Sequence, residues 1–433
     1  MRRYFVLLAV TLTLGCAARA PRPRVVLISV DGLWARDLQR AESAGVRLPT
    51  FDSLRRAGSH AVGVIGSFPS VTYPSHTTMI TGVPPARHGV YANGIFTDPA
   101  VRREFDPSYW ERSEIRVPTI FDAARAHGLE VAAVFWPVTA HDTSINYNIP
   151  DAWDPRPGAP SQLTALRSLG TPWLLDSLNA PPAGQPNDSM RAAWAAAIVR
   201  RWNPDLVALH LIDLDHAKHE FGIWGDSAIA ALQARDRDLA VVLGAVQATE
   251  ARRRTTLIVT SDHGFLDYEQ RLRPGVLLSR AGLVSVDSTA RPPVRSWEAA
   301  VQVNGGSVVI LPRDSTDRTL TARIRSAIPD SLVGPGRPIR AVFPRDSIAV
   351  LGGDPRALWA LDLNEGFYGV SGYTGPLLSA RTGGGHGYDQ RRPELHAFFL
   401  ITGPGVQRGT TRPLMRQTEI AGIVARILSL RGF

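Results

Sequence analysis

The sequence contains very little cysteine or lysine. Of its 433 residues, one is a cysteine, Cys16, and one is a lysine, Lys218. A single cysteine excludes an internal disulfide framework, and its place near the N-terminus leaves no thiolate for a metal site in the folded domain. The formal charge of +9 is carried by scattered arginines, whose longest cluster is Arg252-Arg253-Arg254. We therefore interpret the charge as a bias of composition and expect no specific binding to nucleic acid.

Long apolar runs are also scarce. The run from Tyr4 to Leu14 follows the basic pair Arg2-Arg3, is too short to span a bilayer, and leads into Leu14-Gly15-Cys16. This pattern resembles a bacterial lipoprotein signal, with residues 1–15 as signal peptide, Cys16 as the lipidated residue and 16–24 as a tether. A simple cleaved signal peptide is the alternative. The sequence thus predicts an exported protein, periplasmic or at the cell surface, that meets the membrane only through a lipid at Cys16.

Short continuous apolar runs alternate with helical patterns through the rest of the chain. With 44% hydrophobic residues, the chain can bury a large core. Continuous β-branched runs are typical of strands buried on both faces, and their alternation with helices predicts a parallel, doubly wound α/β sheet. The expected strands are 24–30, 60–66, 129–136, 205–212, 255–260 and 396–403, and the expected helices are 49–58, 118–128, 188–202, 226–250 and 418–430.

Two stretches interrupt this alternation. Residues 147–188 are rich in Pro, Gly and Asp, and we expect an excursion over the rim of the site with one helical patch at 171–178. Residues 271–380 have short strands and many turns, which favours a smaller α+β cap insertion. The sequence therefore predicts a catalytic core of residues 25–270, the cap, and a return to the core at 381–433.

Thr72 precedes a short helical pattern that contains Pro74 and ends at Gly82. A hydroxyl at a helix N-terminus lies where free N–H groups and the helix dipole attract an anion, which suits a nucleophile for phosphoryl transfer. Taken alone, an ordinary threonine N-cap is the favoured interpretation.

Acidic residues and histidines follow several of the predicted strands. Asp31 follows the first strand, Asp215 and His219 lie four apart after another, and Asp262-His263 end a third. Strand ends carry the ligand sites of open α/β sheets, and residues four apart share one face of a helix. A turn at Asp31 and a solvated loop at 213–222 are the alternatives, whereas Asp262-His263 is harder to explain as a turn.

A glycine-rich segment, 382–389, adds His386. Together with Thr72, the three aspartates and three histidines form two N/O ligand sets of the kind that Zn²⁺ accepts. Two metals about 4 Å apart are the usual arrangement for displacement at phosphorus.

The motifs resemble, in order and spacing, the nucleotide pyrophosphatase/phosphodiesterase family of the alkaline phosphatase superfamily, over most of the chain from Val25 to about Leu430. They are S-V-D-G at 29–32, T-Y-P-S-H at 72–76, T-G-V-P-P-A-R-H-G at 81–89, F-W-P at 135–137, D-H-A-K-H at 215–219, S-D-H-G at 261–264 and G-H-G-Y-D at 385–389.

The resemblance implies an alkaline-phosphatase-like fold with two Zn²⁺ per chain. It assigns Asp215, His219 and His386 to one zinc, and Asp31, Asp262 and His263 to the other, which also binds the Thr72 oxygen. It implies hydrolysis of phosphodiester or pyrophosphate bonds in nucleotides or related small molecules through a phosphothreonine at Thr72. Asn93 matches the amide that contacts a phosphate oxygen, and Tyr73 matches the aromatic residue under the base of nucleotide substrates.

Three positions depart from the family pattern: Val71, Ser75 and Lys218. Val71 and Lys218 leave the nucleotide specificity open without touching the metal chemistry. For Lys218 we expect a solvent-facing side chain, and the alternative is a contact to the phosphate or leaving group.

Other functions remain open on the same residues. Phosphomonoesterase and phosphonate hydrolase activities use the same scaffold, and a zinc-binding lipoprotein without turnover would need the ligands but neither Thr72 nor Asn93. A sulfatase is disfavoured because the Cys/Ser-x-Pro-x-Arg context is absent.

Overall fold

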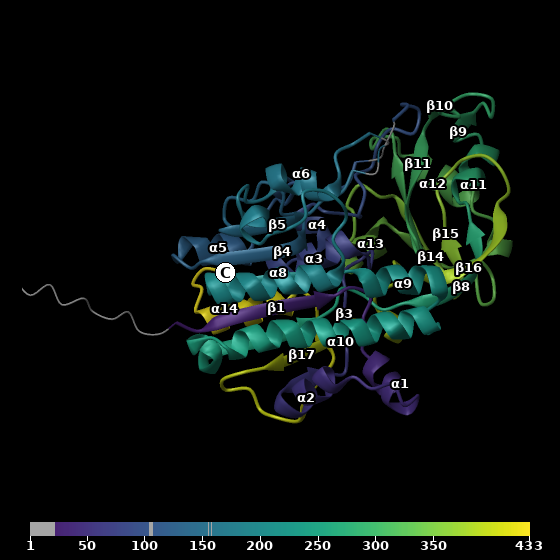
Figure 1. Cartoon of the computed structure of the whole chain (residues 1–433). Helices are drawn as coiled ribbons and strands as arrows, with labels where there is room; N and C mark the ends of the chain where they lie inside the picture. Colours follow the sequence, from purple (N-terminus) through teal and green to yellow (C-terminus); the bar gives the residue numbers. More distant parts are fainter. Residues whose placement is uncertain (1–21, 104–106, 155, 157) are drawn as a thin grey trace, which may run out of the picture.

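A computed structural model describes residues 22–103, 107–154, 156 and 158–433 (Figure 1). The expected signal peptide and Cys16 lie outside these residues, as does most of the expected tether. Within these ranges, every helix is too short or too polar to cross a membrane.

An eight-stranded sheet forms the centre of the molecule (Figure 1). From one edge to the other, its strands are β18 (Thr410–Arg412), β2 (Ser59–Ala61), β17 (Phe399–Thr402), β7 (Thr255–Thr260), β1 (Arg24–Val30), β6 (Leu206–Leu211), β4 (Val131–Pro137) and β5 (Tyr147–Asp151). The run from β7 to β5 is parallel, and β17 is antiparallel to both of its neighbours. The expected α/β fold with a mostly parallel sheet is confirmed.

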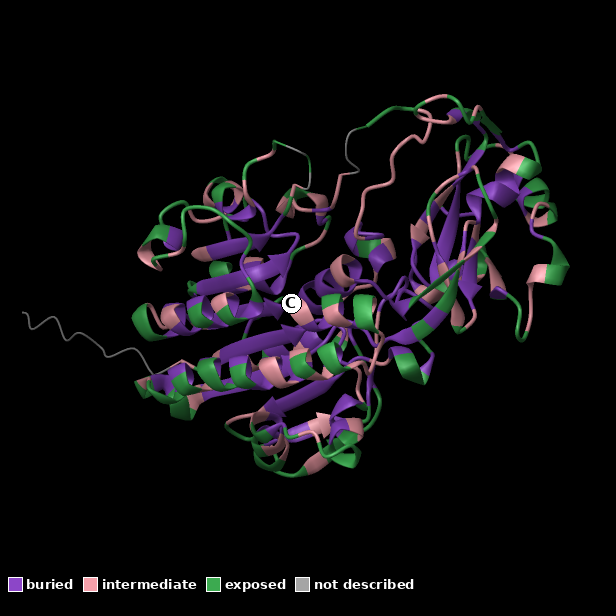
Figure 2. Ribbon diagram, turned by 45° about the vertical axis from the view of Figure 1, so that its right-hand side comes forward, coloured by how far each residue is buried: buried purple, intermediate pink, exposed green. Residues whose placement is uncertain are grey.

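Both faces of the sheet are covered, because the side chains of each strand alternate between two apolar layers. In β1, Val26 and Ile28 belong to one layer, whereas Val25 and Leu27 belong to the other. The inner strands β4, β6 and β7 are accordingly buried along their whole length, as the purple central strands of Figure 2 show. The first layer includes α1 (Asp37–Ser43), α2 (Pro49–Ala57), α6 (Gln162–Leu169), α7 (Leu174–Ser177), α8 (Asp188–Arg201) and α10 (Asp226–Gln247). The second includes α3 (Thr72–Thr81), α5 (Ile120–Ala126) and α14 (Glu419–Leu428).

Two expectations about the core are wrong. The stretch 147–188 is no simple excursion, because it contributes the edge strand β5 and the helix α6, whereas α7 lies within the expected helical patch at 171–178. The expected strand at 60–66 is two short strands in different sheets, β2 and β3 (Val64–Ile65), and β3 pairs with β19 (Met415–Arg416).

A second body, the cap, lies beyond one end of the central sheet (Figure 1). Its antiparallel sheet has the order β11 (Ala299–Asn304), β12 (Ser307–Pro312), β14 (Trp359–Leu363), β13 (Ile339–Pro344). The other cap elements are β9 (Val284–Val286), β10 (Val294–Trp297), α11 (Gly275–Arg280), α12 (Leu320–Ser326) and α13 (Arg345–Leu351). A three-stranded sheet of β15 (Gly366–Gly369), β8 (Leu266–Leu272) and β16 (Leu378–Gly385) includes both ends of the expected insertion.

The carboxyl ends of the parallel strands position the candidate site. Asp31 directly follows β1, and Asp262 and His263 follow β7. Asp215 lies in the first turn of α9 (Asp213–Phe221), which follows β6 after one residue. Since these neighbouring strands are parallel, the three aspartates meet at one edge of the sheet.

Candidate active site

Thr72 is the first residue of α3, and Val71 occupies the N-cap position. Gly82 ends the helix in the left-handed conformation, with φ of 71°. The Tyr73 amide donates to Asn93, Pro74 has no N–H, and the Ser75 amide donates to Val71 O. Among the described residues no hydrogen-bond partner is found for the Thr72 hydroxyl, so the side chain does not act as an N-cap. The hydroxyl lines a cavity of about 790 Å³ together with Asp31, Asp215 and His386.

Asn93 is held beside Thr72 in a fixed orientation. Its Oδ1 accepts a hydrogen bond of 2.9 Å from the Tyr73 backbone N–H. Because an amide side chain has one oxygen and one nitrogen, this bond leaves the NH₂ group of Asn93 as the end that can donate into the cavity. A neutral donor next to the candidate nucleophile suits an anionic oxygen on phosphorus.

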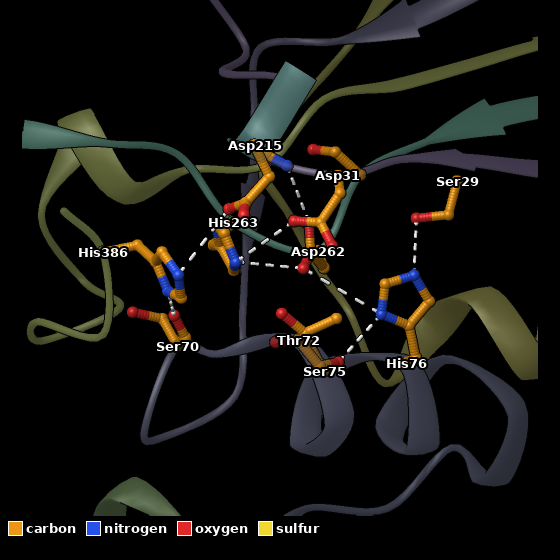
Figure 3. A network of polar contacts seen from close by, with 12 residues as sticks. Ser29, Asp31, Ser70, Thr72, Ser75, His76, Asp215, Asp262, His263 and His386 are labelled. Carbon is orange, nitrogen blue, oxygen red and sulfur yellow. Dashed lines mark hydrogen bonds and ion pairs between the residues drawn. The ribbon is translucent and has the colours of Figure 1, made fainter. Parts of the chain in front are cut away.

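The structure brings the expected metal-ligand residues together at this edge (Figure 3). Two groups have ligand atoms within 4.8 Å of one another: Asp31, Asp262 and His263, and Asp215, His263 and His386. His263 belongs to both groups, so the two candidate sites are adjacent. His219, the remaining expected ligand, has its Nε2 3.5 Å from Asp215 Oδ2.

The imidazoles are oriented by backbone carbonyls behind them. His386 Nδ1 donates to Ser70 O at 3.1 Å, and His219 Nδ1 donates to Gly384 O at 2.9 Å. Each Nε2 therefore faces the cluster, and the two Nε2 atoms lie 3.0 Å apart. Two neutral Nε2 atoms present only lone pairs to one another, so this separation is favourable when a proton or a metal ion lies between them.

The carboxylates give a second test of whether the cluster fits metal ions. Asp31 Oδ1, Asp215 Oδ1, Asp262 Oδ2 and His263 Nε2 are buried without a hydrogen-bond partner among the described residues. Burial, together with the neighbouring carboxylates of Asp262 and Asp215, raises the pKa of Asp31 well above its usual value. Buried carboxylates that lack a Lys or Arg partner are stabilised by bound cations, and oxygen and imidazole donors suit Zn²⁺. The residues therefore fit the expected metal set.

His210 contacts Asp31 and was not found from the sequence. Its Nδ1 donates to Phe135 O at 3.1 Å, and its Nε2 lies 2.9 Å from Asp31 Oδ2. Burial lowers the pKa of His210 well below its usual value, so the ring is neutral and its Nε2 is an acceptor. The available signal was a single histidine inside the otherwise apolar strand β6, because a buried polar side chain needs a partner.

His76 supports α3 from behind. Its Nδ1 donates to Thr72 O at 2.8 Å, and its Nε2 accepts from Ser29 Oγ at 2.9 Å. Burial lowers the pKa of His76 to about 4, which keeps the ring neutral in this bridge. The first turn of α3 is thereby attached to the end of β1.

Tyr73 follows the candidate nucleophile and lies near a buried carboxyl group. This group is Asp151 at the end of β5, and burial raises the pKa of Asp151 to about 6. Both residues line the same cavity as Thr72, as does the exposed Trp153. Tyr73 thus lines the cavity beside Asp151, a buried acid that the sequence did not reveal.

The loop that carries His386 requires glycine. Gly387 has φ of +90°, and a Cβ at this position would lie 1.8 Å from Asn304 O. A side chain at 387 would therefore push the loop away from β11 and displace His386.

The expectation that Lys218 faces solvent is wrong. Its side chain is 2% exposed, and its Nζ donates to Gly32 O at 2.9 Å and to Asp37 Oδ2 at 2.6 Å. Asp37 Oδ2 also accepts from the Trp34 N–H. Lys218 thus ties α9, which carries Asp215 and His219, to the turn after Asp31.

Replacing Lys218 by alanine is expected to lower the free energy of unfolding by about 3–5 kcal/mol, because Asp37 would remain as a buried carboxylate without its cation. Urea denaturation of both proteins measures the change. Glu220→Ala, at an exposed position of the same helix, is the control and should change stability by less than about 0.5 kcal/mol. Equal stability of Lys218→Ala and wild type would contradict a structural role for this ion pair.

Comparisons with known proteins agree with this geometry. The family model described as "Type I phosphodiesterase / nucleotide pyrophosphatase" matches residues 25–389. The chain is 26% identical over 258 residues to ectonucleotide pyrophosphatase/phosphodiesterase family member 1 of Homo sapiens, which covers 58% of this chain and 24% of the human protein. It is 25% identical over 258 residues to a venom phosphodiesterase of Macrovipera lebetinus, covering 58% of this chain and 26% of that protein. The matched part of the chain thus spans about a quarter of either relative.

A solved structure shares the fold. Murine ectonucleotide pyrophosphatase/phosphodiesterase 5 superposes with a TM-score of 0.67 and 20% identity, covering 95% of this chain and 96% of the murine chain. An inactive threonine-to-alanine variant of the murine protein, in complex with AMP, matches equally well, with a TM-score of 0.67 and the same identity and coverage. The resemblance inferred from the motifs is confirmed, and because the family model covers most of its length, the chain belongs to the type I phosphodiesterase / nucleotide pyrophosphatase family.

Proposed function

We propose that the chain is a two-zinc hydrolase of phosphodiester or pyrophosphate bonds that acts through a phosphothreonine at Thr72. The observation that carries the proposal is the position of the Thr72 hydroxyl at the start of α3. It has no partner among the described residues and lines one cavity with Asp31, Asp215 and His386. The murine neighbour described as inactive after a threonine-to-alanine change, with AMP bound, supports this choice of nucleophile and a nucleotide-like small-molecule substrate.

The proposed ligand sets are those expected from the motifs. Asp215, His219 and His386 hold one ion, and Asp31, Asp262 and His263 hold the other. Zn²⁺ in such a set acts as a Lewis acid that stabilises negative charge at phosphorus. Asn93 donates to a phosphate oxygen through its NH₂ group, and the start of α3 adds the positive end of the helix dipole. Tyr73 packs against the organic ester group.

The charges around Thr72 favour diesters over monoesters. Arg191 is the arginine among the described cavity residues, and its guanidinium donates to Asp188 Oδ1 at 2.5 Å and lies 3.6 Å from Asp213 Oδ1. Its charge is therefore already compensated. A monoester dianion carries one negative charge more than a diester and would find no further free cation among the described lining residues. A neutral organic group on phosphorus suits this site better.

A pair of nitrophenyl substrates tests the assignment. We expect kcat/KM for the nitrophenyl ester of thymidine 5′-phosphate to exceed that for nitrophenyl phosphate by at least about tenfold, which corresponds to about 1.4 kcal/mol. A matched assay of Thr72→Ala identifies any contaminating hydrolase. A clear preference for the monoester would contradict the diesterase proposal and favour the phosphomonoesterase alternative, and hydrolysis of a phosphonate ester alone would favour a phosphonate hydrolase.

We also propose export and a lipid anchor at Cys16, which lies outside the described residues. The support is the sequence pattern of residues 1–16 and the names of the relatives, which describe an ecto-enzyme and a venom protein.

A further inference from the structure

The candidate site opens into two cavities rather than one. The larger, described above, contains Thr72 and Asp31. A second cavity of about 430 Å³, here called the cap-side pocket, lies between the core and the cap and shares Asn93, His219 and His386 with the first. Its remaining walls include Phe96, Gln302, Asn304, Tyr368, Ser371 and Tyr373. Neither Thr72 nor Asp31 lines it.

Strand β11 presents two amide side chains to this pocket. Val301, Gln302, Val303 and Asn304 all line the pocket, and the two amides are more buried than the two valines. Gln302 Nε2 donates to Gly94 O at 2.7 Å, so this strand meets the core loop that carries Asn93.

Both amides keep an unused hydrogen-bonding group. Gln302 and Asn304 are 9% and 7% exposed, yet Gln302 Oε1 and Asn304 Nδ2 have no hydrogen-bond partner among the described residues. A buried polar atom without a partner is costly, and such atoms are rare outside sites that receive a ligand or water. One acceptor and one donor are therefore available to a bound molecule.

The pocket offers hydrogen bonds and aromatic surface but no free charge. Its described lining includes no Lys, Arg, Asp or Glu. Burial raises the pKa of Tyr373 to about 12 and raises that of Tyr368 further, so both phenols are neutral. Such walls suit a neutral group with hydroxyls or a ring, and apart from the ion proposed at His219 and His386 they provide no cation for a multiply charged anion.

The position of the pocket relative to Thr72 indicates which part of a substrate it receives. In an in-line displacement the leaving oxygen lies opposite the attacking oxygen. Thr72 lines the larger cavity and not the cap-side pocket, whereas His219 and His386 line both. A group that leaves on the side away from Thr72 therefore enters the cap-side pocket.

We propose that the cap-side pocket is the leaving-group subsite and that it selects diesters whose leaving group is a neutral alcohol, such as a nucleoside, over substrates that release pyrophosphate. This inference rests on the proposed function.

In the first step the Thr72 oxygen forms a bond to phosphorus and the ester P–O bond breaks. The proton of the Thr72 hydroxyl ends on the departing alcohol, which leaves without charge. Water then cleaves the phosphothreonine and releases the nucleotide monoester. A nucleoside triphosphate would instead place a multiply charged pyrophosphate in a pocket whose described walls contain no Lys or Arg.

Two substrates that differ only in the leaving group test the proposal. For the metal-loaded enzyme, we expect kcat/KM for a dinucleoside monophosphate to exceed that for the matching nucleoside 5′-triphosphate by about tenfold or more, a difference of about 1.4 kcal/mol. Asn304→Ala should lower kcat/KM for the dinucleoside by about fivefold, mainly through KM, as expected for one neutral hydrogen bond. Ser371→Arg, at an exposed rim position, should raise kcat/KM for the triphosphate and so reduce the ratio of the two kcat/KM values. Gln247→Ala, at an exposed position near the end of α10, is the matched amide control.

A binding measurement separates this inference from the proposed function. In the Thr72→Ala background, calorimetry should give tighter binding of the dinucleoside than of the triphosphate, and Asn304→Ala should remove most of the difference. Tighter binding of the triphosphate would overturn the subsite assignment while leaving the hydrolase proposal intact. So would a ratio of kcat/KM values, dinucleoside over triphosphate, that neither Asn304→Ala nor Ser371→Arg changes. Hydrolysis of no diester at all would contradict the proposed function, and the binding comparison would still decide the role of the pocket.

Discussion

Replacing Thr72 by alanine is expected to reduce kcat/KM on a nitrophenyl diester by at least about 10³-fold, because the change removes the attacking oxygen of the proposed two-step reaction. The fold should be unaffected. The Thr72 hydroxyl has no hydrogen-bond partner among the described residues, and alanine is favourable at a helical position. The unfolding free energy and the metal content should therefore match those of the wild type, and Thr72→Ser should keep part of the activity.

A second threonine of α3 provides the control. Thr77 is fully buried, and its Oγ1 also lacks a hydrogen-bond partner. Thr77→Val removes this hydroxyl while keeping the shape of the side chain, and it should leave kcat/KM within about twofold. Undiminished turnover of Thr72→Ala would contradict the mechanism, since no other residue has been placed as the nucleophile.

Removing the metal ions is expected to abolish activity, and adding Zn²⁺ should restore it. Asp31, Asp215 and Asp262 converge in a buried cluster, and in the described structure none of the three forms an ion pair with Lys or Arg. Without a cation the cluster keeps a proton on Asp31, whose pKa is raised by burial and by the other two carboxylates. Binding of metal should therefore release protons and raise the melting temperature.

Elemental analysis and calorimetry of the chelated and reloaded protein measure these effects. We expect close to two Zn²⁺ per chain and loss of at least one in Asp262→Asn. Asp346→Asn, at an exposed position in the first turn of α13, is the control and should keep both ions. Full activity after exhaustive chelation, or a metal content near zero in active protein, would contradict the metal proposal.

The strand ends of the site could be predicted because local signals and topology agree there. Val25–Val30 and Thr255–Thr260 are largely apolar or β-branched runs. Asp31 follows the first directly, and Asp262 follows the second after Ser261. If such strands are taken as parallel neighbours, their carboxyl ends meet at one edge. The convergence of Asp31 and Asp262 could therefore be predicted without knowing any contact between them.

Strand β5 was missed because its composition resembles a loop. It contains Asn148, Pro150 and Asp151, which are rare in central strands. β5 is the last strand of the sheet, and among the described residues it pairs only with β4. Proline is tolerated at such an edge, and composition alone cannot distinguish an edge strand of this kind from an irregular segment.

The role of Lys218 could not be predicted because its partner is distant in sequence. The helical spacing of Leu214, Asp215 and Lys218 places them on one buried face of α9. Asp37, however, is 181 residues away, and no local pattern indicates that its carboxylate faces this helix. Pairings of this kind depend on the packed structure.

The central claim is that Thr72 becomes phosphorylated during turnover. Rapid mixing of the metal-loaded enzyme with a nitrophenyl diester, acid quenching within one turnover and mass spectrometry of the peptide that contains Thr72 test this claim directly. The proposal predicts a phosphodiester or phosphate adduct on Thr72 that appears with the release of nitrophenol, decays as the product forms, and is absent from Thr72→Ala. Full release of nitrophenol with an unmodified Thr72 at every quench time would contradict it.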